Sequence, residues 1–90
     1  MDPTITINER VSVVAVFRAK GTIAALCLPW KMNWRGRDIV MTELALRHPT
    51  EAGRRMVHVF HVSDGSNGYR LEFDAETLTW TLVSVIAEQP

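Results

Sequence analysis

Residues 30–40, WKMNWRGRDIV, place two tryptophans, three cationic side chains and a glycine in one short segment. Cationic side chains neutralise phosphates and aromatic rings stack on bases, so this mixture is one that nucleic-acid-binding proteins use. The same residues also fit an ordinary β-hairpin with its turn at the glycine. The candidate binding residues are Lys31, Arg35 and Arg37, with Arg54 and Arg55 farther along the chain.

The spacing within this segment favours the hairpin. In an extended chain Trp30, Met32 and Trp34 share one face, and the polar residues between them share the other. A stacking platform needs rings and cations on the same face, whereas this pattern predicts rings toward a core and cations toward water. Gly36 is then predicted at positive φ in a tight turn. The hairpin leaves unexplained only the two arginines beside this glycine, which could bind a phosphate, a carboxylate or a partner protein.

Other residue types that could do chemistry lack the spacing that chemistry needs. His58 and His61 are three residues apart, so on a strand they point to opposite sides and cannot chelate one metal ion. Cys27 lies among apolar residues and is predicted to be a buried thiol. The segment 63–68, SDGSNG, fits a hairpin loop better than a calcium loop. We find no nucleophile motif, phosphate loop or carboxylate pair, and predict no catalytic residue, no metal, no cofactor and no enzymatic activity.

The elements that carry these residues are predicted to be strands. Blocks of β-branched and aromatic residues alternate with Gly, Pro and Asn, and helical periodicity is hard to find. Pro29 predicts an edge position or a bulge, and residues 47–53 are predicted to form a loop. Because the connections are short, we expect an antiparallel meander that curls into a strongly bent sheet or a small SH3-like barrel. The six predicted strands cover about 10–18, 22–34, 37–46, 55–62, 69–74 and 78–87.

Alternation predicts which side chains face inward. Tyr69, Leu71 and Phe73 share one face of their strand, and Leu78, Trp80 and Leu82 share one face of the next. Residues 55–62 are apolar on both faces, which is typical of a central strand. These patterns predict half-buried strands around a single core.

Length and composition limit the organisation and the partners. Ninety residues, 47% of them hydrophobic and 22% charged, make one globular domain over 1–90, with 1–9 predicted to be disordered. No apolar run approaches the roughly 20 residues of a membrane span. The acidic start does not match a secretory signal, and a single cysteine suits a reducing compartment. We therefore expect a cytoplasmic protein that does not cross a membrane.

The net charge is zero, but it is unevenly distributed along the chain. Residues 10–55 contain nine Lys or Arg and three Asp or Glu, and the remainder is acidic to the same extent. This allows a positive face on the folded protein. It also allows the acidic residues to neutralise the basic segment once the chain folds, and we favour that second interpretation.

The segment PWKMNWRGRDIV, with VVAVF before it and HVFHVSDG, YRLEFD and WTL after it, resembles a group of short uncharacterised bacterial proteins. Their pattern is a proline, an aromatic residue, then tryptophan, glycine, arginine and an aliphatic residue, followed by a tyrosine strand and a tryptophan strand. Met32 stands where that pattern has an aromatic residue. The resemblance covers about residues 11–86 and implies an all-β fold but no activity, cofactor or partner. The matching residues are Pro29, Trp34, Gly36, Arg37, Tyr69 and Trp80.

Two functions agree with these observations. The first is a non-enzymatic binding module for protein interaction or assembly, with a partner protein or a second copy of the chain on an open sheet edge or apolar patch. The alternative is a nucleic-acid-binding β-barrel that uses the basic hairpin. The neutral overall charge favours the first, and the basic segment favours the second.

Overall fold

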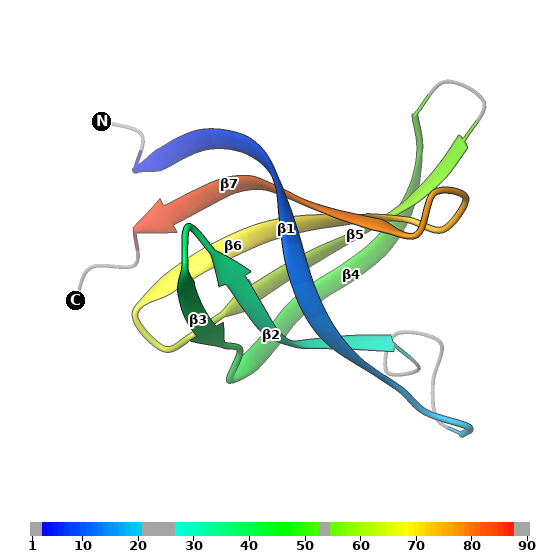
Figure 1. Ribbon diagram of the computed structural model, residues 1–90, viewed down its shortest axis with the longest axis horizontal. Coiled ribbons are helices and arrows are strands. Elements are labelled where there is room, and N and C mark those ends of the chain that lie inside the picture. The colour runs from blue at the N-terminus through cyan, green and yellow to red at the C-terminus, as the bar shows by residue number, and fades with distance from the viewer. Residues whose placement is uncertain (1–2, 21–26, 53–54, 88–90) are drawn as a thin grey trace.

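The computed structural model describes residues 3–20, 27–52 and 55–87, with the side chains of 45–52 and of 55 excepted. The described residues form strands and turns and contain no helix (Figure 1). The strands are β1 (Thr4–Phe17), β2 (Cys27–Trp34), β3 (Arg37–Val40), β4 (Glu43–Ala52), β5 (Arg55–Ser63), β6 (Asn67–Asp74) and β7 (Thr79–Ala87). The predicted all-β class is confirmed.

All seven strands belong to one antiparallel sheet with the order β3-β2-β1-β7-β6-β5-β4. The sheet is strongly curled into a half-barrel, as predicted (Figure 1). Most neighbours in the chain are neighbours in the sheet, as in a meander. Two features depart from a simple meander: β1 pairs with β7, and β3 does not pair with β4 but lies at the opposite edge of the sheet.

Strand β1 connects the two halves of the curl. Its first part, from Thr4 to Val11, pairs with β7, and its second part, from Ser12 to Phe17, pairs with β2. The register with β7 shifts between Thr6 and Glu9, where Asn8 has φ 53°. Asparagine tolerates this left-handed conformation better than most residues. The strand begins at Thr4, six residues before the predicted start, because this first part is held by β7.

The core fills the inside of the curl. Phe60, Leu71 and Leu82 are fully buried, and Trp80 is 8% exposed. The ring of Trp80 packs against Phe60 and Phe73, with centroids 5.3 and 4.8 Å apart. These contacts join β5, β6 and β7 and confirm Trp80 as a core residue.

Two predictions about the strands are wrong. The predicted strand 37–46 is interrupted at Met41 and Thr42, which carry the chain from one edge of the sheet to the other. The N–H of Met41 donates to the carbonyl oxygen of Trp30 on β2, and the N–H of Thr42 donates to that of Ser63 on β5. Both distances are 2.8 Å. The predicted loop 47–53 is mostly part of β4, which continues to Ala52. An edge strand can contain a proline, here residue 49, because one side of it needs no ladder hydrogen bond.

Leu78 is a further correction. We expected it to face the core with Trp80 and Leu82, but it is 74% exposed. It lies in the turn before β7 and has φ 59°. The turn is organised by Asp74, whose Oδ1 accepts hydrogen bonds from the N–H groups of Glu76 and Thr77. The alternation of β7 therefore begins one residue later than predicted.

Candidate binding surface

The β2–β3 hairpin turns at Arg35 and Gly36. Their φ angles are 54° and 81°, and Trp34 pairs with Arg37 across the turn. Two consecutive positive φ values in a two-residue loop are typical of a type I′ turn, which matches the twist of the flanking strands. The predicted positive φ at Gly36 is confirmed.

The tip of this hairpin is fastened to β1 by Glu9. The carboxylate of Glu9 accepts hydrogen bonds from Trp34 Nε1 at 3.1 Å and Arg35 Nε at 3.2 Å. It also forms an ion pair with Arg35 Nη2. The guanidinium lies 4.9 Å from the centroid of the Trp34 ring. Glu9 directly follows the irregular turn of β1 at Asn8, which lets the bent strand reach the hairpin.

These contacts change the protonation of both partners. The hydrogen bond from Arg35, with that from Trp34, lowers the pKa of Glu9 below its ordinary value. The same hydrogen bond raises the pKa of Arg35. Arg35, predicted as a ligand-binding residue, is therefore already paired within the protein.

The other predicted cations have different surroundings. Lys31 Nζ lies 5.6 Å from the centroid of the Trp30 ring, a cation–π arrangement. Arg37 is exposed on the edge strand β3. Arg54 lies outside the described residues, and Arg55 begins β5 with a side chain that is not described. Lys31, Arg35 and Arg37 therefore share one hairpin but have different surroundings, and the side chains of Arg54 and Arg55 are not described.

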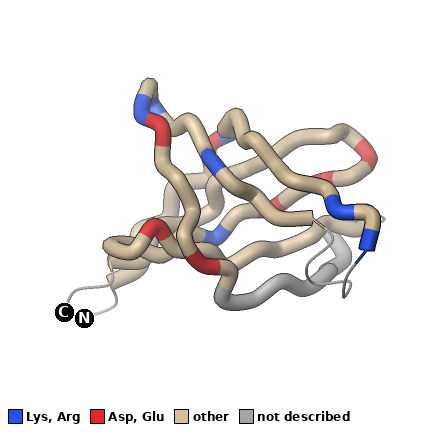
Figure 2. The backbone as a smooth tube through the Cα atoms, turned by 90° about the horizontal axis from the view of Figure 1, so that it is seen from below, with Lys and Arg blue, Asp and Glu red and all other residues tan. Residues whose placement is uncertain are grey.

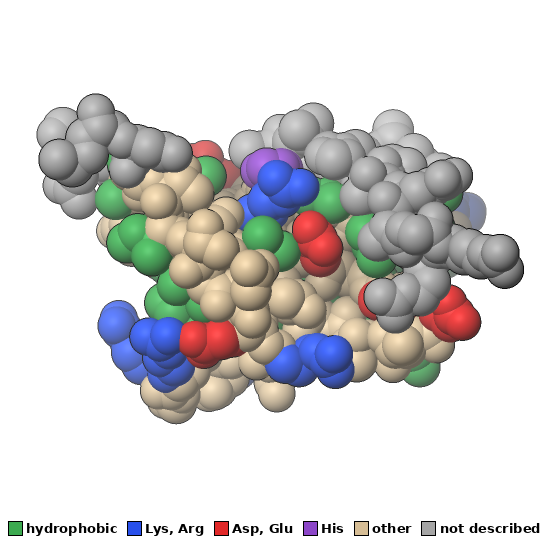
Figure 3. All heavy atoms as spheres, turned by 90° about the horizontal axis from the view of Figure 1, so that it is seen from above, with side chains coloured by type: hydrophobic (Ala, Val, Ile, Leu, Met, Phe, Trp, Pro, Cys, Tyr) green, Lys and Arg blue, Asp and Glu red, His purple; other side chains and the backbone are tan. Residues whose placement is uncertain are grey.

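The described cationic residues do not gather into one patch on the sides of the molecule shown in Figures 2 and 3. Lys and Arg positions are spread over the described chain, and Asp and Glu positions lie among them (Figure 2). On the face shown in Figure 3, groups of Lys and Arg side chains are separated and acidic side chains lie between them. The uneven charge along the sequence is therefore mixed by folding in the regions seen here.

Apolar side chains do gather on the outer face of β1, β2 and β3. Val14 pairs with Lys31, and Lys31 pairs with Val40, so these three residues form a row across the strands. Val16 follows Val14 on the same face. Val14, Val16 and Val40 are 47, 42 and 45% exposed. Together with Trp30 we call these three valines the outer apolar patch.

Trp30 joins this patch because of a bulge. The register between β1 and β2 shifts so that Val14 pairs with Lys31 but Ala15 pairs with Pro29, which leaves Trp30 as the extra residue. Trp30 is 50% exposed, whereas Met32 is fully buried. The bulge that Pro29 predicted is confirmed. The prediction that Trp30 faces the core is wrong, because an extra residue reverses the alternation on one side of it.

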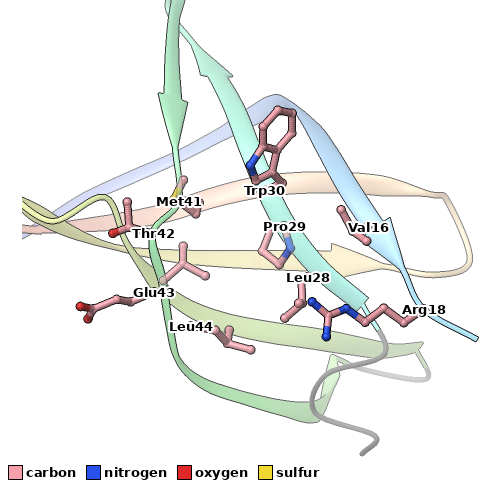
Figure 4. A pocket seen from close by; sticks show the side chains of 10 residues that line it. Val16, Arg18, Leu28, Pro29, Trp30, Met41, Thr42, Glu43 and Leu44 are labelled. Carbon is pink, nitrogen blue, oxygen red and sulfur yellow. The ribbon is translucent and has the colours of Figure 1, made fainter. Parts of the chain in front are cut away.

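A groove begins beside the patch, where the curled sheet does not close. It lies between the end of β1, the start of β2 and the start of β4, and has a volume of about 210 Å³ (Figure 4). Its rim carries Arg18, whose guanidinium extends toward Leu28, and Glu43, whose carboxylate points away from Arg18 (Figure 4). The apolar lining is Val16, Leu28, Pro29, Trp30, Met41, Leu44 and Val62.

Sequence reasoning missed the patch and the groove. A signal for the patch was present: VSVVAVF is apolar at Val14 and Val16 as well as at the alternate positions, which lie on the inner face. A strand that is apolar on both faces and is not covered on one of them leaves an exposed surface. The groove has no local signal, because its lining comes from segments of the chain that are separated by ten or more residues.

The segment 63–68 forms a hairpin, as predicted, with residues 64–66 as the loop between β5 and β6, and Asp64 organises it. Its Oδ1 accepts hydrogen bonds from the N–H groups of Ser66 and Asn67, each at 2.8 Å, and its Oδ2 accepts one from the Tyr69 hydroxyl at 2.8 Å. Burial alone would raise the pKa of Asp64, but these hydrogen bonds together lower it. Burial and the bond to Asp64 raise the pKa of Tyr69.

Residues that could ligate a metal ion are scattered in the described structure. Within 3–20, 27–52 and 55–87, no three His, Cys, Asp or Glu residues come together as a possible metal site. His58 lies near Phe73, with ring centroids 6.4 Å apart, and Cys27 is half-buried. The described part of the chain has no helix that is long and apolar enough to cross a membrane.

Comparisons with protein-family models, with curated proteins and with solved structures found no match to this chain. The resemblance to short bacterial proteins therefore stays a prediction. The functional argument rests on the outer apolar patch, the groove and the hairpin.

Proposed function

We propose that this chain is a non-enzymatic module that binds a partner protein through the outer apolar patch and the adjoining groove. The observation that carries the proposal is the group of exposed apolar side chains on three adjacent strands, Val14 and Val16 on β1, Trp30 on β2 and Val40 on β3. This group surrounds Lys31 and is continuous with the groove through Val16 and Trp30. Contiguous exposed apolar surface is a mark of interaction sites. Exposed tryptophans are enriched among the residues that dominate binding energy at protein interfaces.

The size of the groove supports a protein partner over a small-molecule ligand. Pockets for drug-sized ligands and cofactors measure about 300–1,000 Å³, and this groove measures about 210 Å³. It is one part of a larger, flatter surface, as protein interfaces are. The cytoplasm is proposed as the compartment, in keeping with the single thiol of Cys27.

One observation favours the nucleic-acid alternative. Trp30 is exposed with Lys31 beside its ring, so a ring and a cation share one face, as base stacking requires. The surroundings argue against it, because valines flank this pair and Arg35 is engaged with Glu9. Few cations are then left at the hairpin to neutralise phosphates, the main source of nucleic-acid affinity. A protein partner is therefore our first proposal.

The test is site-specific photo-crosslinking in the cells that produce the protein. A benzophenone amino acid replaces Val14 in the outer apolar patch, and the matched control carries it at the exposed apolar residue Leu78, in the turn before β7. We expect a discrete protein adduct from position 14 that is absent from position 78. No adduct at position 14, or equal adducts from both positions, would overturn the proposal. A nuclease-sensitive adduct at position 14 would replace it with the nucleic-acid alternative.

A further inference from the structure

The groove accommodates one large apolar side chain. Its volume is about 210 Å³, and a dry apolar cavity of about 150 Å³ is enough for a benzene ring. Its walls are apolar, from Leu28 and Pro29 on one side and Leu44 on the other. A leucine, methionine or phenylalanine of a partner fits this space and would be largely removed from water there.

The backbone beside the groove can pair with an added strand. Strand β4 is the last in the sheet order, so its outer edge has no partner among the described strands. Across the groove from β4 lies the start of β2, and β3 covers β2 only from Lys31 to Trp34. The hydrogen bond from Met41 N–H to the carbonyl of Trp30 ties the two sides together at one end. From that point the gap between β2 and β4, which we call the seam, opens along β4.

An open edge beside an apolar groove suits a particular kind of occupant. An extended segment pairs its main chain with the edge and places alternate side chains in pockets. A helix or a folded surface would leave the N–H and C=O groups of the edge unpaired. The proline at position 49 lacks an N–H group, so the usable edge of β4 lies between Glu43 and that residue.

Charge at the rim indicates one further feature of the occupant. Arg18 is exposed, has no ion pair among the described residues, and extends its guanidinium over the mouth of the groove (Figure 4). Lys31 adds a second cation on the patch side. A carboxylate placed near the anchoring side chain would pair with Arg18 through charge-assisted hydrogen bonds.

We infer that the partner supplies an extended segment that adds as a strand to the outer edge of β4, inserts one large apolar side chain into the groove and places an acidic group on Arg18. This inference rests on the proposed function and specifies its ligand. It concerns the contact mode and the sequence of the ligand, so it can fail while protein binding itself stands.

The first experiment offers the full 90-residue chain to a display library of random twelve-residue peptides. We expect enriched sequences that combine a large apolar residue with a nearby Asp, Glu or terminal carboxylate. The best sequence is synthesised and its affinity is measured by fluorescence anisotropy. A series of copies is then made in which one backbone amide at a time is N-methylated.

Strand addition predicts a period of two in this series. Every second amide points at the edge, so methylation there removes a hydrogen bond and should lower affinity roughly threefold to tenfold. The amides between them point to solvent and should tolerate methylation. A uniform or irregular pattern would refute strand addition, and this result needs no variant of the protein to fold.

Protein variants place the contact. Val16→Glu, at a partly exposed wall of the groove, should lower peptide affinity at least tenfold, and Leu78→Glu is its matched control. Arg18→Gln should lower affinity roughly threefold to tenfold and flatten the salt dependence, and Arg37→Gln is the control for loss of a charge. Equal effects in variants and controls would put the site elsewhere and overturn the inference.

The outcomes separate the two proposals. If no peptide is enriched but the benzophenone residue at position 14 still crosslinks to a protein, the extended-segment inference fails and the proposed function stands. If neither peptides nor crosslinks appear, both fail. Enriched peptides with alternating amide sensitivity that depend on Val16 and Arg18 support both.

Discussion

Trp80 and Trp30 are the same residue type in opposite environments, and truncating each to alanine should have very different costs. Trp80 is 8% exposed and packs on Phe60 and Phe73 with centroids 5.3 and 4.8 Å away. Removing a buried large aromatic costs about 3–5 kcal/mol. The two ring pairs, each worth about 0.5–1.5 kcal/mol beyond burial, place Trp80 in the upper part of that range. We therefore expect Trp80→Ala to cost about 4–5 kcal/mol.

Trp30→Ala should cost much less. Trp30 is 50% exposed, and the one ring contact described for it is with Lys31 at 5.6 Å. An exposed cation–π contact is worth about 0.5–1 kcal/mol, so the cost should stay near about 1 kcal/mol. A domain of this size has a total stability of very roughly 5–13 kcal/mol. Trp80→Ala could consume much of that stability, whereas Trp30→Ala should leave the domain folded.

Urea denaturation followed by far-UV circular dichroism measures both changes without relying on tryptophan fluorescence. With a slope of about 1.5–2 kcal/mol per M, a loss of 4–5 kcal/mol moves the midpoint by about 2–3 M. Trp80→Phe, which keeps an aromatic ring in the core, should fall between Trp80→Ala and the wild type. Equal midpoint shifts for Trp80→Ala and Trp30→Ala, or a larger shift for Trp30→Ala, would refute the core and bulge assignments.

Three further predictions address the hairpin. Gly36→Val should destabilise by about 1 kcal/mol or more through backbone strain alone, since Gly36 has φ 81° and an added Cβ meets nothing within 4 Å; Gly36→Asn should cost less, and equal denaturation midpoints for the two variants would contradict the type I′ turn. The hydrogen bond from Arg35 lowers the pKa of Glu9 in the folded protein. The ionised Glu9 carboxylate therefore stabilises the fold at pH values above the unfolded pKa near 4.5, and this stabilisation is lost as the pH falls through the lower folded pKa. Glu9→Gln should therefore lose less stability than the wild type when the pH of a thermal melt is lowered through that range, and identical losses would show that the Glu9–Arg35 contact does not form in solution. A labelled single-stranded oligonucleotide should show no measurable binding even at low salt; binding with a log-log salt slope of about −0.7 per contact that Lys31→Glu with Arg37→Glu removes would instead establish the nucleic-acid alternative.

The sequence alone determined the class of the fold and the inner faces of several strands. The alternation at 69–73 and around Trp80 places Tyr69, Leu71, Trp80 and Leu82 inward, and the structure buries all four. The glycine at position 36 predicted a turn with positive φ, and the structure has one there. These features depend on the two-residue period of a strand and on the φ angles of single residues, and both are local properties that a sequence displays directly.

The position of Trp30 was decided by the tertiary structure. Pro29 predicted a bulge, but the sequence did not show that the extra residue would be Trp30, which takes that ring to the outer face. A shift of one residue in register reverses every side chain on one side of it. The register of β2 depends on its pairing with β1, so it cannot be predicted from the residues of the segment 30–40.

The remaining decisions join residues that are far apart in the chain. Glu9 pairs with Arg35, which is 26 positions away in the chain, so this predicted ligand-binding cation is already engaged within the protein. The pairing of β1 with β7 and the separation of β3 from β4 set the edges of the sheet and leave the seam that forms the groove. Local alternation states which face a side chain takes, but closure of a sheet depends on which strands meet, and only the packed chain determines that.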